Sequence, residues 1–392
     1  MEVKPGYKQT EVGVIPEDWD AVPMQAITTH IGDGLHGTPV YSSNGDYFFI
    51  NGNNLNTGKI VISGDTRLVD HSEFTKHRKP LSDRSILMSI NGTIGNLGLF
   101  EGERVVLGKS AAYLNVKFGI SRQFVYHSLQ TSVVRRQFFN GLTGTTISNL
   151  GLATIRRTQI PLPPTDGEQR AIAEALSDVD GLLGGLDRLI AKKRDLKQAA
   201  MQQLLTGQTR LPGFHGEWKP KRFAELLKYE RPDKFLVNSA EYLEKGDIPV
   251  LTANKSFILG YTNDDFGIYQ SLPAIIFDDF TTDSKYVDFP FKVKSSAIKI
   301  LKARSAEANL LFIFARMRLV NFPLGEHKRY YISEYQHIEL PTPEPDEQIA
   351  IAEVLTDMDA ELAAFEQRRE KTRALKQAMV QELLTGKTRL LR

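Results

Sequence analysis

The stretch that decides the fold is EQRAIAEALSDVD at residues 168–180, taken with LLTGQTRL at 204–211, because both phrases return near the end of the chain. The second copies read EQIAIAEVLTDMD at 347–359 and LLTGKTRL at 383–390. Aligned without gaps, residues 168–211 and 347–390 are identical at 24 of 44 positions. Ordinary residue frequencies give only about three identities by chance. An internal repeat of this length indicates the organisation of the whole chain.

Each copy has the apolar spacing of one long helix. Steps of four and three alternate, which is the a/d pattern of a coiled coil, at Ile172, Leu176, Val179, Leu183, Leu186 and Ile190, and at Ile351, Leu355, Met358, Leu362 and Phe365. Thr165 and Glu168 have the spacing of a capping box, and LLTG places a glycine at each C-terminal end. About 38 helical residues predict a rod of roughly 57 Å. We expect the two rods to pack on each other.

Three glycines interrupt the first rod, at Gly181, Gly184 and Gly185, where the second copy has alanines. Each glycine inside a helix costs about 1 kcal/mol relative to alanine. Two interpretations stay open, a close approach of the two helices and a kink.

The segments outside the rods contain short β-type stretches separated by turns, such as DYFFINGNNLNTGKIVI at 46–62 and GDIPVLTANKSFILGYTN at 246–263. Apart from such shared features, the two segments differ widely. The prediction is therefore an α+β chain with a two-fold internal design, a variable domain at 1–162, a rod at 163–211, a second variable domain at 212–341 and a second rod at 342–392.

Composition limits the classes of function. With 41% hydrophobic and 24% charged residues, the chain is typical of globular proteins, and no segment approaches the ~18 consecutive apolar residues of a membrane span. The polar N-terminal stretch lacks the apolar region of a signal peptide, and cysteine is absent, so we expect a cytoplasmic protein without disulfides or thiolate metal sites. The net charge of +2 means that any nucleic-acid binding depends on local basic patches.

Catalytic motifs are approached but not matched. GERVVLGKS at 102–110 imitates a phosphate-binding loop, yet five residues separate its glycines where four are required. The histidines lack the spacing of a metal site, and no Asn-Pro-Pro-Tyr type motif for amino methylation is found. We therefore expect no catalytic residues, no metal and no cofactor on this chain.

The order of variable domain, rod, variable domain and rod resembles the specificity subunits of type I restriction–modification systems. The resemblance covers essentially the whole chain and is carried by GTTISNLGLATIRRTQIPLPP (144–164), EQRAIAEALSDVD (168–180), LLTGQTRLPGF (204–214), FDDFTTDSKYVDFPF (277–291), YYISEYQHIELPTPEPDEQIAIAEVL (330–355) and the closing LLTGKTRL. It implies two target recognition domains, and two conserved helices that pair antiparallel as a coiled coil.

The resemblance also implies a function. Each recognition domain would read one half of a bipartite, asymmetric site in double-stranded DNA, and the paired helices would set the spacer and dock two methyltransferase subunits. Restriction and translocase subunits would join through these, and S-adenosylmethionine, ATP and magnesium would be bound by partners only. Two alternatives remain, the specificity subunit of a fused methyltransferase–nuclease system and a structural coiled-coil adaptor.

Candidate DNA contacts are basic clusters, which suit phosphates, and polar residues of loops between strands, which suit base edges. They are Arg78, Lys79, Asn91, Thr93, Lys109, Thr145 and Thr146 in the first domain, and Asn254, Lys255, Thr281, Thr282, Lys285, Arg316, Lys328 and Arg329 in the second. For partner contact the candidates are Leu204, Leu205, Leu383 and Leu384, with packing against the neighbouring recognition domain as the alternative.

Overall fold

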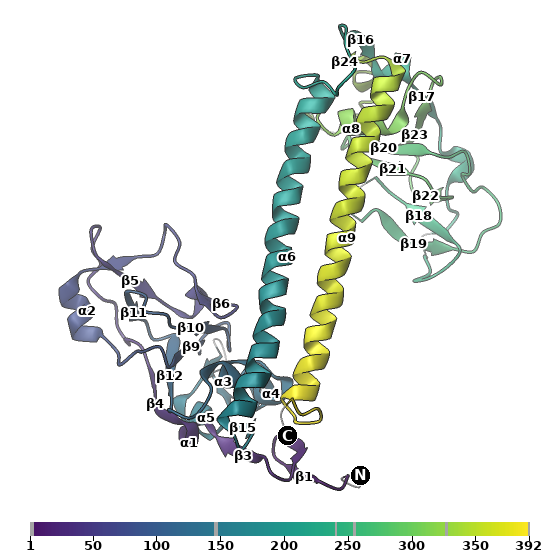
Figure 1. The fold of residues 1–392 in the computed structure, drawn as a ribbon. Coiled ribbons are helices and arrows are strands. Elements are labelled where there is room, and N and C mark those ends of the chain that lie inside the picture. The colour runs from purple at the N-terminus through teal and green to yellow at the C-terminus, as the bar shows by residue number, and fades with distance from the viewer. Residues whose placement is uncertain (1–3, 145–147, 240, 254–255, 326–327, 391–392) are drawn as a thin grey trace. The chain divides into compact units, whose positions relative to one another are not determined.

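The computed structural model describes residues 4–144, 148–239, 241–253, 256–325 and 328–390. The chain divides into two compact units (Figure 1). Unit 1 comprises Met1–Leu186 and Arg368–Arg392, and unit 2 comprises Asp187–Gln367. Each unit therefore holds one of the two variable segments together with parts of both repeats.

Unit 1 is built around a four-stranded antiparallel sheet in the order β10-β9-β12-β4. Smaller sheets accompany it, in the orders β11-β5-β8, β15-β3, β1-β2, β6-β7 and β13-β14. The strands are β1 (Tyr7–Thr10), β2 (Gly13–Pro16), β3 (Asp20–Pro23), β4 (Thr28–Asp33), β5 (Tyr47–Ile50), β6 (Leu55–Asn56), β7 (Lys59–Ile60), β8 (Leu68–Val69), β9 (Ser85–Ser89), β10 (Leu97–Leu99), β11 (Val105–Leu107), β12 (Ala111–Val116), β13 (Leu142–Thr143), β14 (Asn149–Leu150) and β15 (Gln159–Leu162). The short helices are α1 (Met24–Ile27), α2 (His71–His77), α3 (Arg122–Ser128), α4 (Ser132–Asn140) and α5 (Leu152–Arg157).

Unit 2 repeats this plan with a different sequence. Its four-stranded antiparallel sheet has the order β21-β20-β23-β17, and the smaller sheets have the orders β19-β18-β22 and β16-β24. The strands are β16 (Lys219–Arg222), β17 (Leu227–Glu230), β18 (Ile248–Leu251), β19 (Ile258–Thr262), β20 (Ala274–Asp278), β21 (Ser284–Val287), β22 (Lys292–Val293), β23 (Ile298–Ala303) and β24 (Glu339–Thr342). The short helices are α7 (Phe223–Leu226) and α8 (Leu310–Met317).

The two repeats form the long helices α6 (Asp166–Thr206) and α9 (Pro345–Leu383). In unit 1 the beginning of α6 packs beside the end of α9, where Lys376 binds Asp180 at 2.6 Å (Figure 1). In unit 2 the end of α6 packs beside the beginning of α9, and Lys193 binds Glu361 at 2.7 Å. Residue numbers rise along one helix as they fall along the other, so the predicted antiparallel pairing within an α+β fold is confirmed.

The a/d residues nearest the helix beginnings complete the core of each unit. Ile172 and Leu176 of α6 are fully buried among side chains of α3, β15 and the end of α9. Ile351 and Leu355 of α9 are buried in the same way against α8 and the end of α6. Burying apolar side chains of this size stabilises the fold by about 1.5–3 kcal/mol each. The long helices are thus structural parts of both units.

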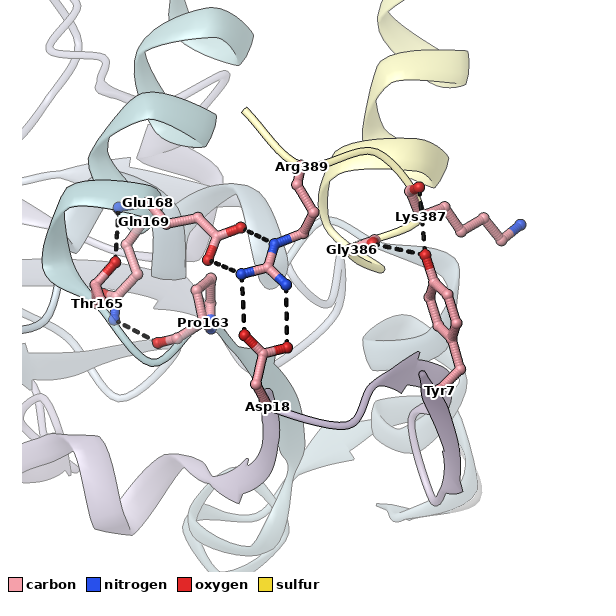
Figure 2. A network of polar contacts seen from close by, with 9 residues as sticks. All are labelled: Tyr7, Asp18, Pro163, Thr165, Glu168, Gln169, Gly386, Lys387 and Arg389. Atoms are coloured by element: carbon pink, nitrogen blue, oxygen red, sulfur yellow. Dashed lines mark hydrogen bonds and ion pairs between the residues drawn. The ribbon is translucent and has the colours of Figure 1, made fainter. Parts of the chain in front are cut away.

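An arginine ties the end of α9 to the beginning of α6 (Figure 2). Arg389, in the phrase TRL that follows α9, binds both carboxylate oxygens of Glu168, with Nη2 lying 2.8 Å from Oε2. Its Nη1 and Nη2 also donate to Asp18 at 3.0 and 3.1 Å, and these hydrogen bonds hold the pKa of the Asp18 carboxyl below its usual value. The Glu168 side chain is only 2% exposed, so this bidentate pair neutralises a buried charge.

The equivalent arginine of the other repeat makes the equivalent contact in unit 2. Arg210, which follows α6, binds Glu347 in the first turn of α9 with Nη2 2.6 Å from Oε2. Trp218 also donates from Nε1 to the same oxygen at 3.1 Å. We call these two contacts the arginine latches. Each latch joins the end of one repeat to the beginning of the other, which explains why both phrases occur twice.

The glutamine after each latch glutamate also has a matched role. Gln169 accepts the backbone N–H of Ser121 at 2.9 Å, and Gln348 accepts that of Asn309 at 2.9 Å. Ser121 and Asn309 are the N-cap residues of α3 and α8. The recurring EQ phrase therefore attaches each long helix to a helix of the neighbouring domain.

The predicted boundaries of α6 are confirmed in part. Thr165 caps the helix by accepting the Glu168 N–H at 3.2 Å (Figure 2), but the Glu168 carboxylate binds Arg389 and does not return to complete a capping box. The buried arginine offers that carboxylate a charged partner, which is stronger than a neutral backbone N–H. At the other ends, Gly207 and Gly386 adopt φ of 74° and 69°, as expected of glycines that terminate helices.

Among the described residues, no helix has both the length and the apolar character that membrane crossing requires.

Candidate nucleic-acid interface

The edge strands of the two four-stranded sheets end in corresponding places but with opposite charges. Ile31 of β4 and Tyr229 of β17 pair with corresponding leucines of the neighbouring strands β12 and β23. Two residues further along lie Asp33 in unit 1 and Arg231 in unit 2. The same place in the fold therefore carries an acid in one unit and a base in the other.

A second pair of corresponding positions lies on the segment that leads back to the long helix. The N–H of Leu150 donates to the carbonyl of the residue after β9 at 2.8 Å, and the N–H of Tyr330 donates to the carbonyl of the residue after β20 at 2.9 Å. The preceding residues are Asn149 in unit 1 and Arg329 in unit 2. An amide in one unit thus replaces a guanidinium in the other.

In unit 1 these residues line a cavity, which we call pocket A. Its volume is about 350 Å³, and its walls come from Asp33, His36, Ile90, Asn91, Lys109, Asn149, Leu150, Gly151 and Leu152. His36 Nε2 lies 2.6 Å from the Asp33 carboxylate. Carboxylate, amide and imidazole groups together offer hydrogen-bond acceptors and donors in one open cavity.

In unit 2 the corresponding cavity, which we call pocket B, has more positive charge. Its volume is about 500 Å³, and its walls come from Tyr229, Arg231, Pro232, Asp233, Asp279, Ser296, Lys299, Arg329, Ile332 and Ser333. Three cations face two carboxylates in this lining, so it has a surplus of positive charge.

A buried ion pair forms one wall of pocket B. Lys299 Nζ lies 3.1 Å from Asp279 Oδ2, and the two side chains are 8% and 2% exposed. Asp279 Oδ1 accepts the N–H of Tyr331 at 2.8 Å. Because each charge satisfies the other inside the wall, Lys299 is not free to bind a ligand by itself.

The two arginines of pocket B are exposed and have free hydrogen-bonding groups. Arg231 makes no hydrogen bond or ion pair with any described residue, and the Arg329 guanidinium lies over the ring of Phe280, 5.5 Å from its centroid. Phe280, Tyr229 and Ile332 are themselves 42%, 36% and 48% exposed. Unpartnered arginines beside exposed aromatic and apolar side chains are typical of surfaces that contact nucleic acids.

Comparison with known proteins agrees with this arrangement. The family model for the type I restriction modification DNA specificity domain matches residues 17–190 and 215–373, most of the chain. The chain belongs to this family. It is therefore a type I restriction–modification specificity subunit, a DNA-recognition component of host defence that is itself non-catalytic.

Relatives of this specificity subunit differ in how much of it they match. The EcoR124I/EcoR124II specificity subunit of Escherichia coli is 43% identical over 176 residues, which span 41% of this chain and 43% of that protein. The MjaVIII specificity subunit of Methanocaldococcus jannaschii is 22% identical over 96% of this chain and 94% of its own. The crystal structure of the type I S subunit from M. genitalium has a TM-score of 0.62 at 16% identity and covers 98% of both chains, which shows the same fold.

Three of the DNA contacts predicted for the specificity subunit lie at the pockets. Asn91 and Lys109 line pocket A, and Arg329 lines pocket B. Thr93 is exposed two residues beyond Asn91. Whether these residues contact DNA stays a prediction.

The predicted contacts between β20 and β21 form a turn. Thr281 donates its N–H to the Asp278 carboxylate at 3.0 Å, Thr282 has a positive φ of 57°, and Lys285 lies opposite Ile276 on β21. None of these threonines or Lys285 lines pocket B.

The remaining predicted contacts are dispersed. Arg78 and Lys79 follow α2, and Lys328 binds Glu334, whose hydrogen bond raises the pKa of the lysine. Four predicted contacts lie outside the described residues, namely Thr145, Thr146, Asn254 and Lys255.

Arg316 has a packing role that its sequence position did not reveal. It lies on α8, where its Nη1 donates to the carbonyl of Leu205, and burial lowers the pKa of its guanidinium. A guanidinium bound to the end of α6 is not presented to DNA, so this predicted contact is wrong.

The four leucines predicted for partner contact are also corrected. Leu204 and Leu205 are 8% and 0% exposed in the core of unit 2, and Leu383 and Leu384 are 5% and 1% exposed in the core of unit 1. The alternative interpretation, packing against the neighbouring domain, is the one that the structure supports.

Several pocket residues were missed from the sequence. Asp33, His36 and Asn149 are ordinary polar residues of short loops, and only the sheet order brings them together. Arg231 carries no signal either. Lys299 did carry one, since it interrupts the apolar run AIKIL at 297–301, where a strand buried on both faces rarely holds a charge without a partner.

Proposed function

We propose that this specificity subunit reads a split, asymmetric site in double-stranded DNA, one half with each unit. The observation that supports this most is the pair of corresponding pockets on otherwise equivalent sheets. The fold around them is repeated, but the residues at corresponding positions differ in charge. Two half-sites of different sequence are the expected consequence, because base edges are read by hydrogen-bonding groups of matching pattern.

We further propose that the paired helices set the spacer and dock two methyltransferase subunits. Helices of 41 and 39 residues are each about 60 Å long. This length can bridge the ~34 Å between half-sites that lie one DNA turn apart. Restriction and translocase subunits would then join through the methyltransferase subunits.

An identical exposed stretch on each helix is our candidate for the docking site. The phrase LKQA occupies 196–199 and 375–378, and its leucines, Leu196 and Leu375, are 47% and 55% exposed. Packing within the chain does not require two exposed leucines to recur at equivalent positions. Two copies of one partner, bound to the two helices in the same way, would require it. Leu196 and Leu375 therefore replace the buried leucines as proposed partner contacts.

We also propose that S-adenosylmethionine, ATP and magnesium act only on the partner subunits, and that the complex works in the cytoplasm. Support for this comes from the sequence, which has no complete motif for phosphate binding or amino methylation.

A methylation map of the host genome, with and without this gene, tests the proposal. We expect a split, asymmetric motif that is modified only when the gene is present. Exchange of residues 212–340 for the same segment of another family member should change one half of the motif and leave the other. A motif that is independent of the gene, although the complex is assembled, would contradict the proposal.

DNA binding by the assembled complex separates this function from a structural adaptor. Contacts with phosphates release counterions, so the affinity should fall steeply as salt rises. An adaptor without a role in DNA binding would show no such dependence.

A further inference from the structure

The two pockets differ in a way that bears on which bases are read. The inference below rests on the proposed function, since it assumes that each unit reads one half-site. It concerns two corresponding pairs of positions, Asp33 with Arg231 and Asn149 with Arg329.

We propose that Arg231 and Arg329 determine specificity by reading the acceptor edge of a guanine in the half-site of unit 2, and that Asp33 and Asn149 read a base with an exposed amino group in the half-site of unit 1. Guanine presents O6 and N7 in the major groove, and two acceptors match the fork of an arginine. Adenine and cytosine present an amino donor there, which a carboxylate or an amide oxygen accepts.

Charge is the first argument. Both arginines of pocket B are replaced by acceptors in pocket A, while the strand order around them is unchanged. If the pockets served only to hold phosphates, both would be expected to keep cations at these positions, because every sequence has the same phosphates. A change of hydrogen-bonding type at two matched positions is expected of base readout.

The second argument is that the arginines of pocket B are held ready for a ligand. The ring of Phe280 supports the guanidinium of Arg329, which limits its freedom before binding. The neighbouring wall is fixed, because Lys299 is bound to Asp279 and that carboxylate also holds the backbone of Tyr331. Preorganised donors lose less entropy on binding, which favours bidentate contact with a base edge.

The third argument is that pocket B supplies apolar contact as well as charge. Tyr229 and Ile332 line it and are partly exposed. Such side chains can pack against the faces and methyl groups of bases, whereas a phosphate gains nothing from them. The combination therefore fits a base edge better than the sugar–phosphate backbone.

The test uses the full complex with its methyltransferase subunits and maps methylation for the wild type, Arg231→Gln and Arg329→Gln. Both arginines are exposed, so these variants should fold and assemble, which thermal unfolding checks. We expect each to relax one G·C pair in one half of the motif, with discrimination at that pair reduced roughly tenfold or more. The other half should stay unchanged.

Two further variants complete the design. Asn149→Ala should relax the other half of the motif and leave the guanine position intact. Arg318→Gln is the matched control, because Arg318 is an exposed arginine of unit 2 outside pocket B. It should leave both halves unchanged.

Three outcomes would overturn the inference. If both pocket variants weaken DNA binding for every sequence and reduce its salt dependence, with the motif intact, the arginines contact phosphates. If the relaxed position is an A·T pair, or if Arg318→Gln relaxes the same pair, the assignment is wrong. These results require a wild-type motif that depends on the gene. If that motif is missing, the proposed function itself fails, and the inference fails with it.

Discussion

Gly181 and Gly185 of α6 lie in open space, because a Cβ added at either position would meet no described atom within 4 Å. For these two glycines, the close-approach interpretation of the sequence is wrong. They cost the helix conformational entropy without permitting any contact.

We therefore predict that Gly181→Ala and Gly185→Ala each stabilise the chain by about 1 kcal/mol. The second repeat supports the change, since it has alanine at both equivalent positions. Urea unfolding of each variant measures the effect. Gly207→Ala is the contrasting control, because Gly207 has a positive φ of 74° and alanine there should destabilise. A loss of stability from the two helix variants would show that the glycines allow a contact or a bend after all.

His127 of α3 is buried against α6 and is 2% exposed. Its Nε2 lies 3.1 Å from the Ser177 hydroxyl, and Asp180 and Lys376 are nearby charged groups. Burial lowers the pKa of His127 to about 4, although Asp180 acts in the opposite direction.

This shift predicts a pH-dependent stability. Between pH 6.5 and about 4 the unfolded chain binds a proton at His127 that the folded chain does not, so the free energy of unfolding falls as the pH is lowered. From pH 7.5 to 5.0 we expect His127 to account for a loss of about 2 kcal/mol. His127→Gln should lack this part of the loss in urea unfolding at both pH values. Equal pH dependence of the two proteins would refute the prediction.

At the scale of elements, the two arginine latches make each long helix depend on the other. Glu168 and Glu347 are each 2% exposed, and each finds its cation beyond the end of the opposite helix. Removing one partner of a buried ion pair leaves the other charged and unsatisfied, which typically costs 3–5 kcal/mol.

Arg389→Ala should therefore destabilise unit 1, and Arg210→Ala unit 2, each by about 3 kcal/mol. Trp19 and Trp218, the two tryptophans of the chain, lie 5.7 and 5.6 Å from these arginines. Trp218→Phe leaves fluorescence from Trp19 as a probe of unit 1, and Trp19→Phe leaves Trp218 as a probe of unit 2.

The matched control is Arg373→Ala, which breaks only an exposed pair with Glu370 on α9. It should cost less than about 1 kcal/mol. If the latch variants cost no more than this control, the latches are surface contacts without structural weight.

For the whole molecule, the exposed leucines on α6 and α9 predict the stoichiometry of the complex. Leu196→Glu or Leu375→Glu alone should leave one methyltransferase subunit bound, and the double variant should bind none, because a charge replaces an apolar contact. Native mass spectrometry of the purified complexes counts the subunits. Both side chains are exposed, so folding should be preserved.

Leu182 offers the control for this experiment. It is 43% exposed on α6, and its equivalent in the second repeat is already a glutamate, Glu361. Leu182→Glu should leave both methyltransferase subunits bound. If it removes a subunit as effectively as Leu196→Glu, the surface contact is not confined to LKQA.

Periodicity and repetition along the sequence determined the long helices, their ends and the two-fold plan. Ile172 and Ile351 could be assigned to a core because apolar spacing is a local property of a helix. The glycines of LLTG could be assigned to helix ends for the same reason, since only the neighbouring residues decide where a helix terminates.

Only the tertiary structure decided which residues meet. Arg389 lies 221 residues from Glu168, and Asp33 lies far in sequence from Asn149, so no local pattern connects either pair. Leu204 and Leu205 looked available for a partner because a helix end exposes its side chains until another domain covers it. The sequence thus determined the elements, whose causes are short-range, while the latches, the pockets and the buried faces follow from long-range packing that a single sequence does not encode in any local pattern.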